Sequence, residues 1–148
     1  IIMTGELFGA NWKIKMDSYL PDEAIVDLKC VRKLRDITFR NGWKQSFIET
    51  WGYDLQLAVY QEIVRQNTGK KLPCIIAGVD KQDISDLDCI LIPEDQLKYQ
   101  LDQLRWKMPH IIDVKNYNIE PVRCGHCDYC RATKKLERLI SPDELIVF

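Results

Sequence analysis

Two aspartates and a lysine follow two short apolar runs of the sequence, and together they could carry metal-dependent chemistry. The runs are Trp12–Met16 and Ala24–Val26, and Asp17 and Asp27 come directly after them. Lys29 stands two positions beyond Asp27, so in a strand both side chains lie on the same side. If the runs are paired strands, the carboxylates and the ammonium converge at one edge of a sheet. This is the layout of a divalent-metal site that hydrolyses phosphodiesters.

These side chains suit a hard cation such as Mg²⁺, which takes one or two carboxylates, keeps waters and shares its other positions with substrate phosphate. Asp17 and Asp27 would supply the carboxylates, and the backbone carbonyl of Leu28 would add a further protein ligand. Lys29 would orient or deprotonate the attacking water. The simpler interpretation is an exposed strand end with a weak ion pair. The same acid-x-Lys triplet recurs at Asp113–Lys115, so the triplet alone is a weak signal.

A glutamine and a tyrosine later in the chain give this triplet its context. Gln56 and Tyr60 are four positions apart in a segment with helical spacing of apolar residues, so they lie on one helix face. A core helix with amphipathic edges explains Leu55, Ala58 and Val59. It does not explain why a glutamine and a tyrosine share a face just after the acid-x-Lys strand.

Asp17, then Asp27-Leu28-Lys29, then Gln56-x-x-x-Tyr60 resemble the PD-(D/E)xK nuclease superfamily, and most closely its RecB/lambda-exonuclease branch. The resemblance covers residues 7–60. It implies that the two aspartates bind the metal and that the lysine is catalytic. It also implies that the glutamine and the tyrosine line the site and help to hold the DNA strand. The chain departs from the branch in two ways: its second acid is Asp where Glu is common, and no upstream helix with an acid or His is present.

The function implied by this resemblance is a Mg²⁺- or Mn²⁺-dependent DNA exonuclease of phage or bacterial recombination and repair, in the cytoplasm of a bacterial or phage-infected cell. Its partners would be DNA, as double-stranded ends or a single strand, and a strand-annealing recombinase or a helicase. An oligomer is compatible with this function. Two alternatives fit the same residues. One is a non-catalytic nucleic-acid-binding or assembly module with the same fold, and the other is an RNA-directed nuclease.

Three cysteines late in the sequence, Cys124, Cys127 and Cys130, are spaced as C-x2-C-x2-C. Three thiolates this close repel one another unless they are protonated or share a metal. The spacing fits three ligands of an iron–sulfur cluster better than a zinc site, which usually pairs two separated units. Iron–sulfur nucleases of the RecB type are similar, which implies a [4Fe-4S] cluster with its fourth cysteine upstream of the nuclease core. Zn²⁺ and reduced structural thiols are the alternatives. The other cysteines are expected to be small core residues: Cys30, Cys74 and Cys89.

Composition narrows the class of protein. The 148 residues, of which 46% are hydrophobic and 29% charged, suit one globular domain. No apolar run approaches the ~20 residues that span a bilayer, so no membrane association is expected. The formal net charge of −1 argues against a uniformly basic nucleic-acid binder, although six basic residues gather between Lys29 and Lys44. The opening Ile1-Ile2-Met3 suggests a fragment that lacks its upstream part.

Strands and helices in alternation must position these side chains. Apolar patterning predicts strands at residues 3–17, Ala24–Val31, Leu72–Val79 and Asp88–Ile92. It predicts helices over Phe47–Asn67 and from Pro93 to Pro109, with loop and short helix in Arg32–Thr50. We therefore expect an α/β fold with a central mixed β-sheet flanked by helices, a restriction-endonuclease-like core as the resemblance implies. Residues 1–120 would form the nuclease core, and residues 121–148 a cysteine-containing segment packed on it.

Overall fold

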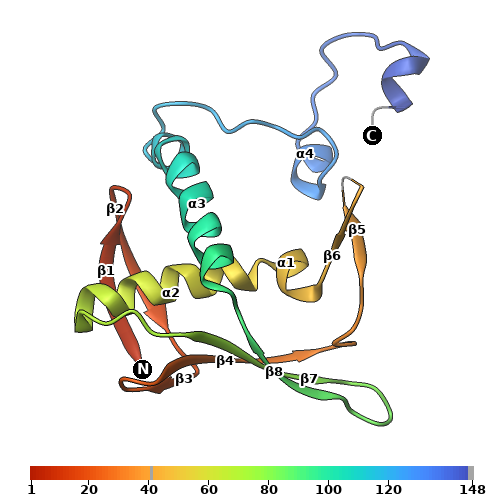
Figure 1. The fold of residues 1–148 in the computed structure, drawn as a ribbon. Coiled ribbons are helices and arrows are strands. Elements are labelled where there is room, and N and C mark those ends of the chain that lie inside the picture. Colours follow the sequence, from red (N-terminus) through yellow and green to blue (C-terminus); the bar gives the residue numbers. More distant parts are fainter. Residues whose placement is uncertain (41, 147–148) are drawn as a thin grey trace. The chain divides into compact units, whose positions relative to one another are not determined.

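The computed structural model describes residues 1–40 and 42–146. It divides into two compact units, Ile1–Asp113 and Val114–Phe148, so the division falls earlier than the expected boundary after residue 120. The packing of the second unit on the first stays a prediction. The first unit holds a mixed sheet with helices against it, which confirms the expected α/β fold class (Figure 1).

The central sheet has four strands in the order β3-β4-β7-β8. These are β3 (Ser18–Leu20), β4 (Ala24–Val31), β7 (Cys74–Asp80) and β8 (Leu87–Leu91). The two middle strands, β4 and β7, run parallel, and each edge strand pairs antiparallel with its neighbour. Between the parallel strands the chain makes its longest excursion, which includes the helix over the sheet, as a parallel connection requires.

One face of the sheet is buried beneath the helix α2 (Tyr53–Thr68). Ile25 of β4 and Ile76 of β7 are fully buried there, and so are Leu57 and Ile63 of the helix. Each such side chain contributes about 1.5–3 kcal/mol by leaving water. Because side chains alternate along a strand, Asp27 and Lys29 of β4 lie on this same, helix-covered face.

The opposite face of the sheet carries three rows of three apolar or thiol side chains, as the strand register shows. The rows are Val26, Ile75, Leu91; Leu28, Ala77, Cys89; and Cys30, Val79, Leu87. The leucines on this face are exposed by 59% at Leu28, 70% at Leu87 and 60% at Leu91. Only Cys74 of the three scattered cysteines is a buried core residue, as predicted. The prediction was wrong for Cys30 and Cys89, which are exposed because they lie on this face.

The first predicted strand is a hairpin of two strands, β1 (Ile2–Leu7) and β2 (Ala10–Lys15). The chain reverses at Phe8 and Gly9, which both have positive φ, at 51° and 80°. Gly9 adopts this conformation without strain, whereas Phe8 gives no sequence signal for it. The prediction of a single strand over residues 3–17 was therefore wrong, although β2 still ends two residues before Asp17.

The helix predicted over Phe47–Asn67 is two helices, α1 (Phe47–Trp51) and α2. Gly52 separates them with φ 68° and ψ 31°, the left-handed conformation that ends helices. Ser46 and Glu49 form a capping box at the start of α1. The break turns the chain, so that α1 lies at an angle to α2 (Figure 1).

The last long helix, α3 (Glu94–Lys115), continues through Pro109, where the sequence predicted its end. A proline inside a helix removes a hydrogen bond and costs about 3 kcal/mol. Packing on both sides of it offsets this cost, because Met108 is buried and Ile112 packs against the core. The start of the helix is tied to α2 through buried Asp54, which accepts hydrogen bonds from Gln96 and Gln100.

Loop and short helix were expected in Arg32–Thr50. A short helix, α1, does begin in this range, but a hairpin of β5 (Thr38–Arg40) and β6 (Trp43–Gln45) precedes it and was not predicted. The second unit contains α4 (Asp128–Ala132) and a 3₁₀ helix at Pro142–Ile146. Among the described residues, no helix combines the length and the apolar character needed to cross a membrane.

Candidate active site

Asp17, Asp27 and Lys29 lie together at the edge of β4 that extends beyond the short strand β3. Asp17 occupies the bend between β2 and β3, and its Oδ2 accepts a hydrogen bond from the backbone N–H of Leu28 at 3.1 Å. Strand β3 pairs only with residues up to Val26 of β4, so this N–H has no ladder partner on β3. Lys29 Nζ lies 2.6 Å from Asp27 Oδ2. The structure thus brings the two carboxylates and the ammonium together.

Gln56 and Tyr60 extend this group from the helix side. The amide of Gln56 contacts both charges, since its Nε2 donates to Asp27 Oδ1 at 3.1 Å and its Oε1 accepts from Lys29 Nζ at 3.2 Å. Gln56 Nε2 also donates to Tyr60 Oη at 2.9 Å, and this hydroxyl donates to the carbonyl of Lys15 at 2.8 Å. All five side chains predicted from the sequence for the nuclease site therefore lie in one contact network.

The buried position of Asp27 changes the pKa of its carboxylate. Its side chain is 3% exposed, and burial raises the pKa of Asp27 above its usual range, although the nearby Lys29 ammonium partly lowers it. The neighbouring Asp17 carboxylate raises the pKa of Asp27 further. Asp27 Oδ2 is buried and accepts no well-oriented hydrogen bond, so its contact with Lys29 is mainly electrostatic.

These observations fit a divalent cation beside Asp17 and Asp27. Two close carboxylates, one of them buried, carry more negative charge than the single Lys29 ammonium neutralises, and a positive ion would balance it. In an extended strand the N–H and C=O of one residue point to the same edge, so the Leu28 carbonyl faces the edge where Asp17 lies. Among the described residues, no third acid, His or Cys completes this pair. Leu28, water and phosphate oxygens would fill the remaining positions.

One residue of the site was missed by the sequence interpretation. The Lys29 ammonium lies over the ring of Tyr53, 4.3 Å from its centroid, a cation–π contact. Tyr53 precedes Gln56 by three positions on α2, so helical spacing alone could have placed it on the same face. The second acid-x-Lys triplet, Asp113–Lys115, forms the last residues of the helix α3, so its acid and lysine do not share a strand face as Asp27 and Lys29 do.

The three clustered cysteines lie in the second unit. The Sγ atoms of Cys124, Cys127 and Cys130 are all within 4.8 Å of one another, close enough to share one metal ion or cluster. Backbone N–H groups of His126 and Cys127 point at the Cys124 sulfur and lower the pKa of that thiol to about 6. A thiol with this pKa is a thiolate at neutral pH, which is the form that binds metals.

The comparisons with known proteins agree with this geometry. Residues 1–133 match a family described as a PDDEXK-like domain of unknown function (DUF3799). The chain belongs to this family. A crystal structure described as a "Putative exonuclease" from Eubacterium rectale is 50% identical to the chain and superposes with a TM-score of 0.92. That match covers 99% of this chain but 55% of the other, so the chain spans about half of the neighbour's length.

The match to this family confirms the resemblance to the PD-(D/E)xK superfamily. The chain's assignment to the RecB/lambda-exonuclease branch stays a prediction, as do the roles of the individual residues. No curated protein matches the chain.

Proposed function

We propose that this PDDEXK-like domain is the catalytic part of a metal-dependent DNA exonuclease of bacterial or phage recombination and repair. The network that joins Asp17, Asp27 and Lys29 to Gln56 is the observation that carries this proposal. The family match and the described exonuclease neighbour support it. A cytoplasmic location and contacts with a strand-annealing recombinase or helicase belong to the same proposal.

Each side chain has a defined part in this proposal. Asp17 and Asp27, with the carbonyl of Leu28, would hold Mg²⁺ or Mn²⁺. When bound, the ion would lower the pKa of a coordinated water and polarise the phosphoryl oxygen. Lys29 would orient the attacking water and stabilise charge on the phosphate, because its ammonium lies 2.6 Å from Asp27 Oδ2 and its side chain is only 17% exposed. Gln56 fixes the directions of both charged groups.

The test uses the full-length protein with end-labelled linear DNA in Mg²⁺ or Mn²⁺. Lys29→Ala and Asp17→Ala should abolish metal-dependent degradation while leaving the thermal melting transition in place. The second acid-x-Lys triplet supplies the matched control, since Lys115→Ala removes the same residue type from α3 and should leave degradation unchanged. Undiminished degradation by either active-site variant would contradict the proposal.

The same assay separates the alternatives. A non-catalytic nucleic-acid-binding module would retain salt-sensitive DNA binding without turnover in either metal. An RNA-directed nuclease would degrade a labelled RNA of the same sequence faster than the DNA. An exonuclease releases short products from a labelled end at once, whereas an endonuclease first produces internal fragments.

The cysteine cluster would hold an iron–sulfur cluster, or else Zn²⁺, as a structural element. Its sulfur geometry and the low pKa of Cys124 support metal binding without deciding the metal. Purification of the full-length protein without oxygen, followed by iron and zinc analysis and a visible absorption spectrum, decides it. Substitution of Cys127 by Ser should release the metal and lower the melting temperature.

A further inference from the structure

A pocket of about 530 Å³ lies next to the candidate active site, within the first unit. Sites for small ligands have roughly this size, about 300–1,000 Å³. The lining comes from the end of β4, the loop after it, the start of β5, and the two helices α1 and α2. Its members used below are Arg32, Lys33, Asp36, Phe47, Trp51 and Tyr53.

Tyr53 joins this pocket to the candidate active site. Its ring lines the pocket and also lies under the Lys29 ammonium, 4.3 Å from it. Lys29 in turn contacts Asp27 at 2.6 Å. Tyr53 and Lys29 therefore connect the pocket to Asp27, one of the carboxylates proposed to hold the metal.

Aromatic side chains form the walls of the pocket. Phe47 is buried and meets Tyr53 edge to face, with ring centroids 6.2 Å apart, so these two rings hold each other in place. Trp51 is 69% exposed, because α1 ends at this residue and Gly52 turns the chain away. An indole that is anchored on a helix end and open to solvent offers a flat surface to a planar ligand.

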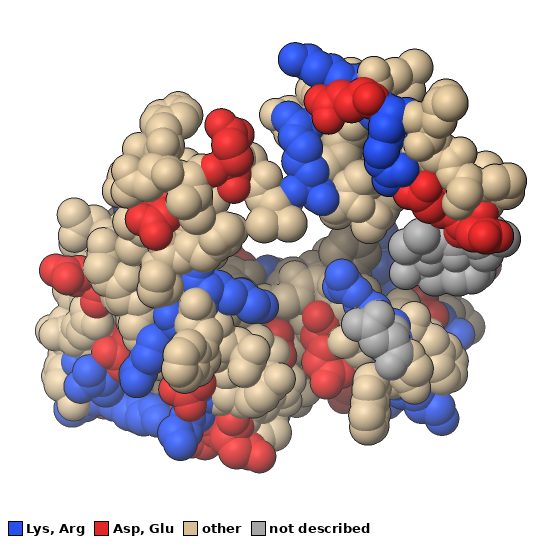
Figure 2. Space-filling model, turned by 90° about the horizontal axis from the view of Figure 1, so that it is seen from above, with Lys and Arg blue, Asp and Glu red and all other residues tan. Residues whose placement is uncertain are grey.

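Basic side chains border this aromatic surface. Arg32 and Lys33 are exposed, and the lining contains one acid, Asp36, which already pairs with Arg32 at 2.8 Å. The adjoining hairpin β5–β6 adds exposed Phe39 and Trp43, at 71% and 76%, and the exposed cations Arg40 and Lys44. On the face seen in Figure 2, acidic and basic side chains are mixed over the surface.

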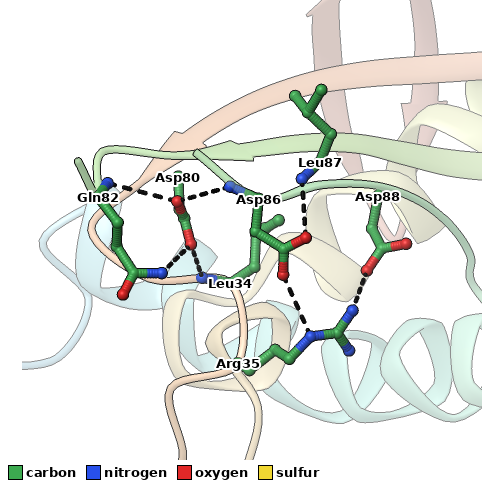
Figure 3. Close-up of polar contacts among 7 residues, drawn as sticks. All are labelled: Leu34, Arg35, Asp80, Gln82, Asp86, Leu87 and Asp88. Carbon is green, nitrogen blue, oxygen red and sulfur yellow. Dashed lines mark hydrogen bonds and ion pairs between the residues drawn. The ribbon is translucent and has the colours of Figure 1, made fainter. Parts of the chain in front are cut away.

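The loop after β4, which carries Arg32 and Lys33, is held by the sheet through its residues Leu34 and Arg35 (Figure 3). The buried carboxylate of Asp80, at the end of β7, accepts a hydrogen bond from the backbone N–H of Leu34 at 3.3 Å. Arg35 binds Asp86 at 3.1 Å and Asp88 at 2.8 Å, which ties the loop to the strand β8. Arg32 and Lys33 are thus presented on an anchored loop.

We propose that this pocket binds an unpaired nucleotide of a single-stranded DNA substrate, with its base stacked on Trp51 and its phosphates near Arg32 and Lys33. Interleaved aromatic and basic side chains are the combination that binds single strands. Bases inside a duplex are stacked on both faces, so they cannot stack on an indole unless the strand is opened. This inference deepens the proposed function, because it assigns a substrate class to the same site.

The test measures binding of a fluorescent single-stranded oligonucleotide to the full-length protein by anisotropy in Mg²⁺. Phosphorothioate linkages protect the oligonucleotide from hydrolysis. Trp51→Ala should weaken binding by about 5- to 150-fold, the range expected when one base no longer stacks on an aromatic ring. Trp51→Phe should retain most of the affinity. Trp106→Ala is the matched control, because Trp106 is 82% exposed on α3 and lies outside the pocket lining.

Two further measurements use the same samples. The double substitution Arg32→Ala with Lys33→Ala should reduce the slope of log affinity against log salt by about 0.7 for each phosphate that these two side chains neutralise. A blunt duplex of the same sequence should bind more weakly than the single strand and should show little response to Trp51→Ala.

The outcomes separate this inference from the proposed function. If Trp51→Ala binds the single strand as tightly as Trp106→Ala does, the inference is overturned, whether or not the protein degrades DNA. In that case the exposed aromatic surface would instead contact another protein segment. If the wild-type protein binds through Trp51 but degrades no DNA in Mg²⁺ or Mn²⁺, the proposed function fails, and the pocket stands as a site that binds single strands without cleaving them.

Discussion

The carboxylate of Asp80 accepts a hydrogen bond from the backbone N–H of Leu34 across 46 residues of sequence. The same carboxylate accepts hydrogen bonds from the backbone of Asp86 at 3.0 Å and from the side chain of Gln82 at 2.6 Å. It therefore fixes two loops at one end of the sheet, the loop after β4 and the loop between β7 and β8. The first of these loops carries Arg32 and Lys33 to the pocket.

Loss of the Asp80 charge should destabilise the fold in a pH-dependent way. Hydrogen bonds, above all the one from the Asp86 N–H, hold the pKa of Asp80 below its usual range. Its stabilisation is therefore fully present above the unfolded-state pKa of about 3.9 and is lost as the pH falls through the lower folded-state pKa. In urea unfolding between pH 3 and 7, Asp80→Asn should be less stable than wild type at pH 7, and this difference should shrink toward pH 3.

Asp83→Asn is the control for this experiment, because Asp83 is an exposed residue of the same loop. A difference between wild type and Asp80→Asn that is the same at every pH would show that the ionised form of Asp80 has no special stabilisation.

Metal binding should weaken on acidification because of Asp27. Burial raises the pKa of Asp27, so this side chain takes up a proton at a higher pH than an ordinary aspartate does. Only the ionised carboxylate binds a metal. Mn²⁺ affinity, measured by calorimetry between pH 4.5 and 8, should be constant at high pH. Below the pKa of Asp27 it should fall up to about tenfold per pH unit. Asp27→Asn should bind weakly with a shallower pH dependence, and an equally steep dependence in that variant would assign the proton to another group.

Gln56 should matter more to the reaction than Tyr60. Its amide contacts Asp27 and Lys29 directly, so Gln56→Ala releases both, and we expect a loss of about 10- to 100-fold in the degradation rate. Tyr60→Phe removes only the hydroxyl that accepts from Gln56 and donates to Lys15, so its loss should be smaller. Initial rates on end-labelled DNA measure both variants. Melting temperatures near that of wild type would show that the losses are not caused by unfolding. The reverse order of effects would mean that Tyr60 contacts the substrate itself.

The cysteines should differ widely in reactivity in the metal-free protein. Backbone N–H groups lower the pKa of Cys124 to about 6, whereas burial raises the pKa of Cys74 to about 12. The thiolate is the reactive form, so iodoacetamide at pH 7.5 should modify Cys124 first and Cys74 last. Peptide mass spectrometry after timed quenching gives the order. In the metal-loaded protein the three clustered cysteines should be protected together, and continued modification of Cys124 alone would contradict shared ligation.

The alternation and helical spacing of the sequence predicted which reactive side chains share a face, and the family resemblance predicted that these two faces meet. Asp27 and Lys29 share a strand face because they are two positions apart, and Gln56 and Tyr60 share a helix face because they are four apart. These are local rules that hold once the strand and the helix form. The overall mixed sheet with helices followed from the same patterns.

Features that depend on tertiary contacts were missed. The reversal at Phe8 requires a positive φ that phenylalanine rarely adopts, and α3 passes Pro109 because core packing on both sides offsets the missing hydrogen bond. The link between Asp80 and Leu34 joins loops far apart in sequence. No periodicity predicts such a link, since neither residue indicates its partner.

The side chain of Gln56 contacts both an ammonium and a carboxylate. Because its amide is neutral, the net charge of the site comes from the other side chains. With Asp17 and Asp27 ionised and Lys29 protonated, the group carries a single negative charge and repels a phosphate. A bound divalent cation reverses that sign. We therefore expect the active site to repel a nucleic-acid backbone before the ion binds and to attract it afterwards. The order of addition of metal and DNA should set the lag before degradation begins.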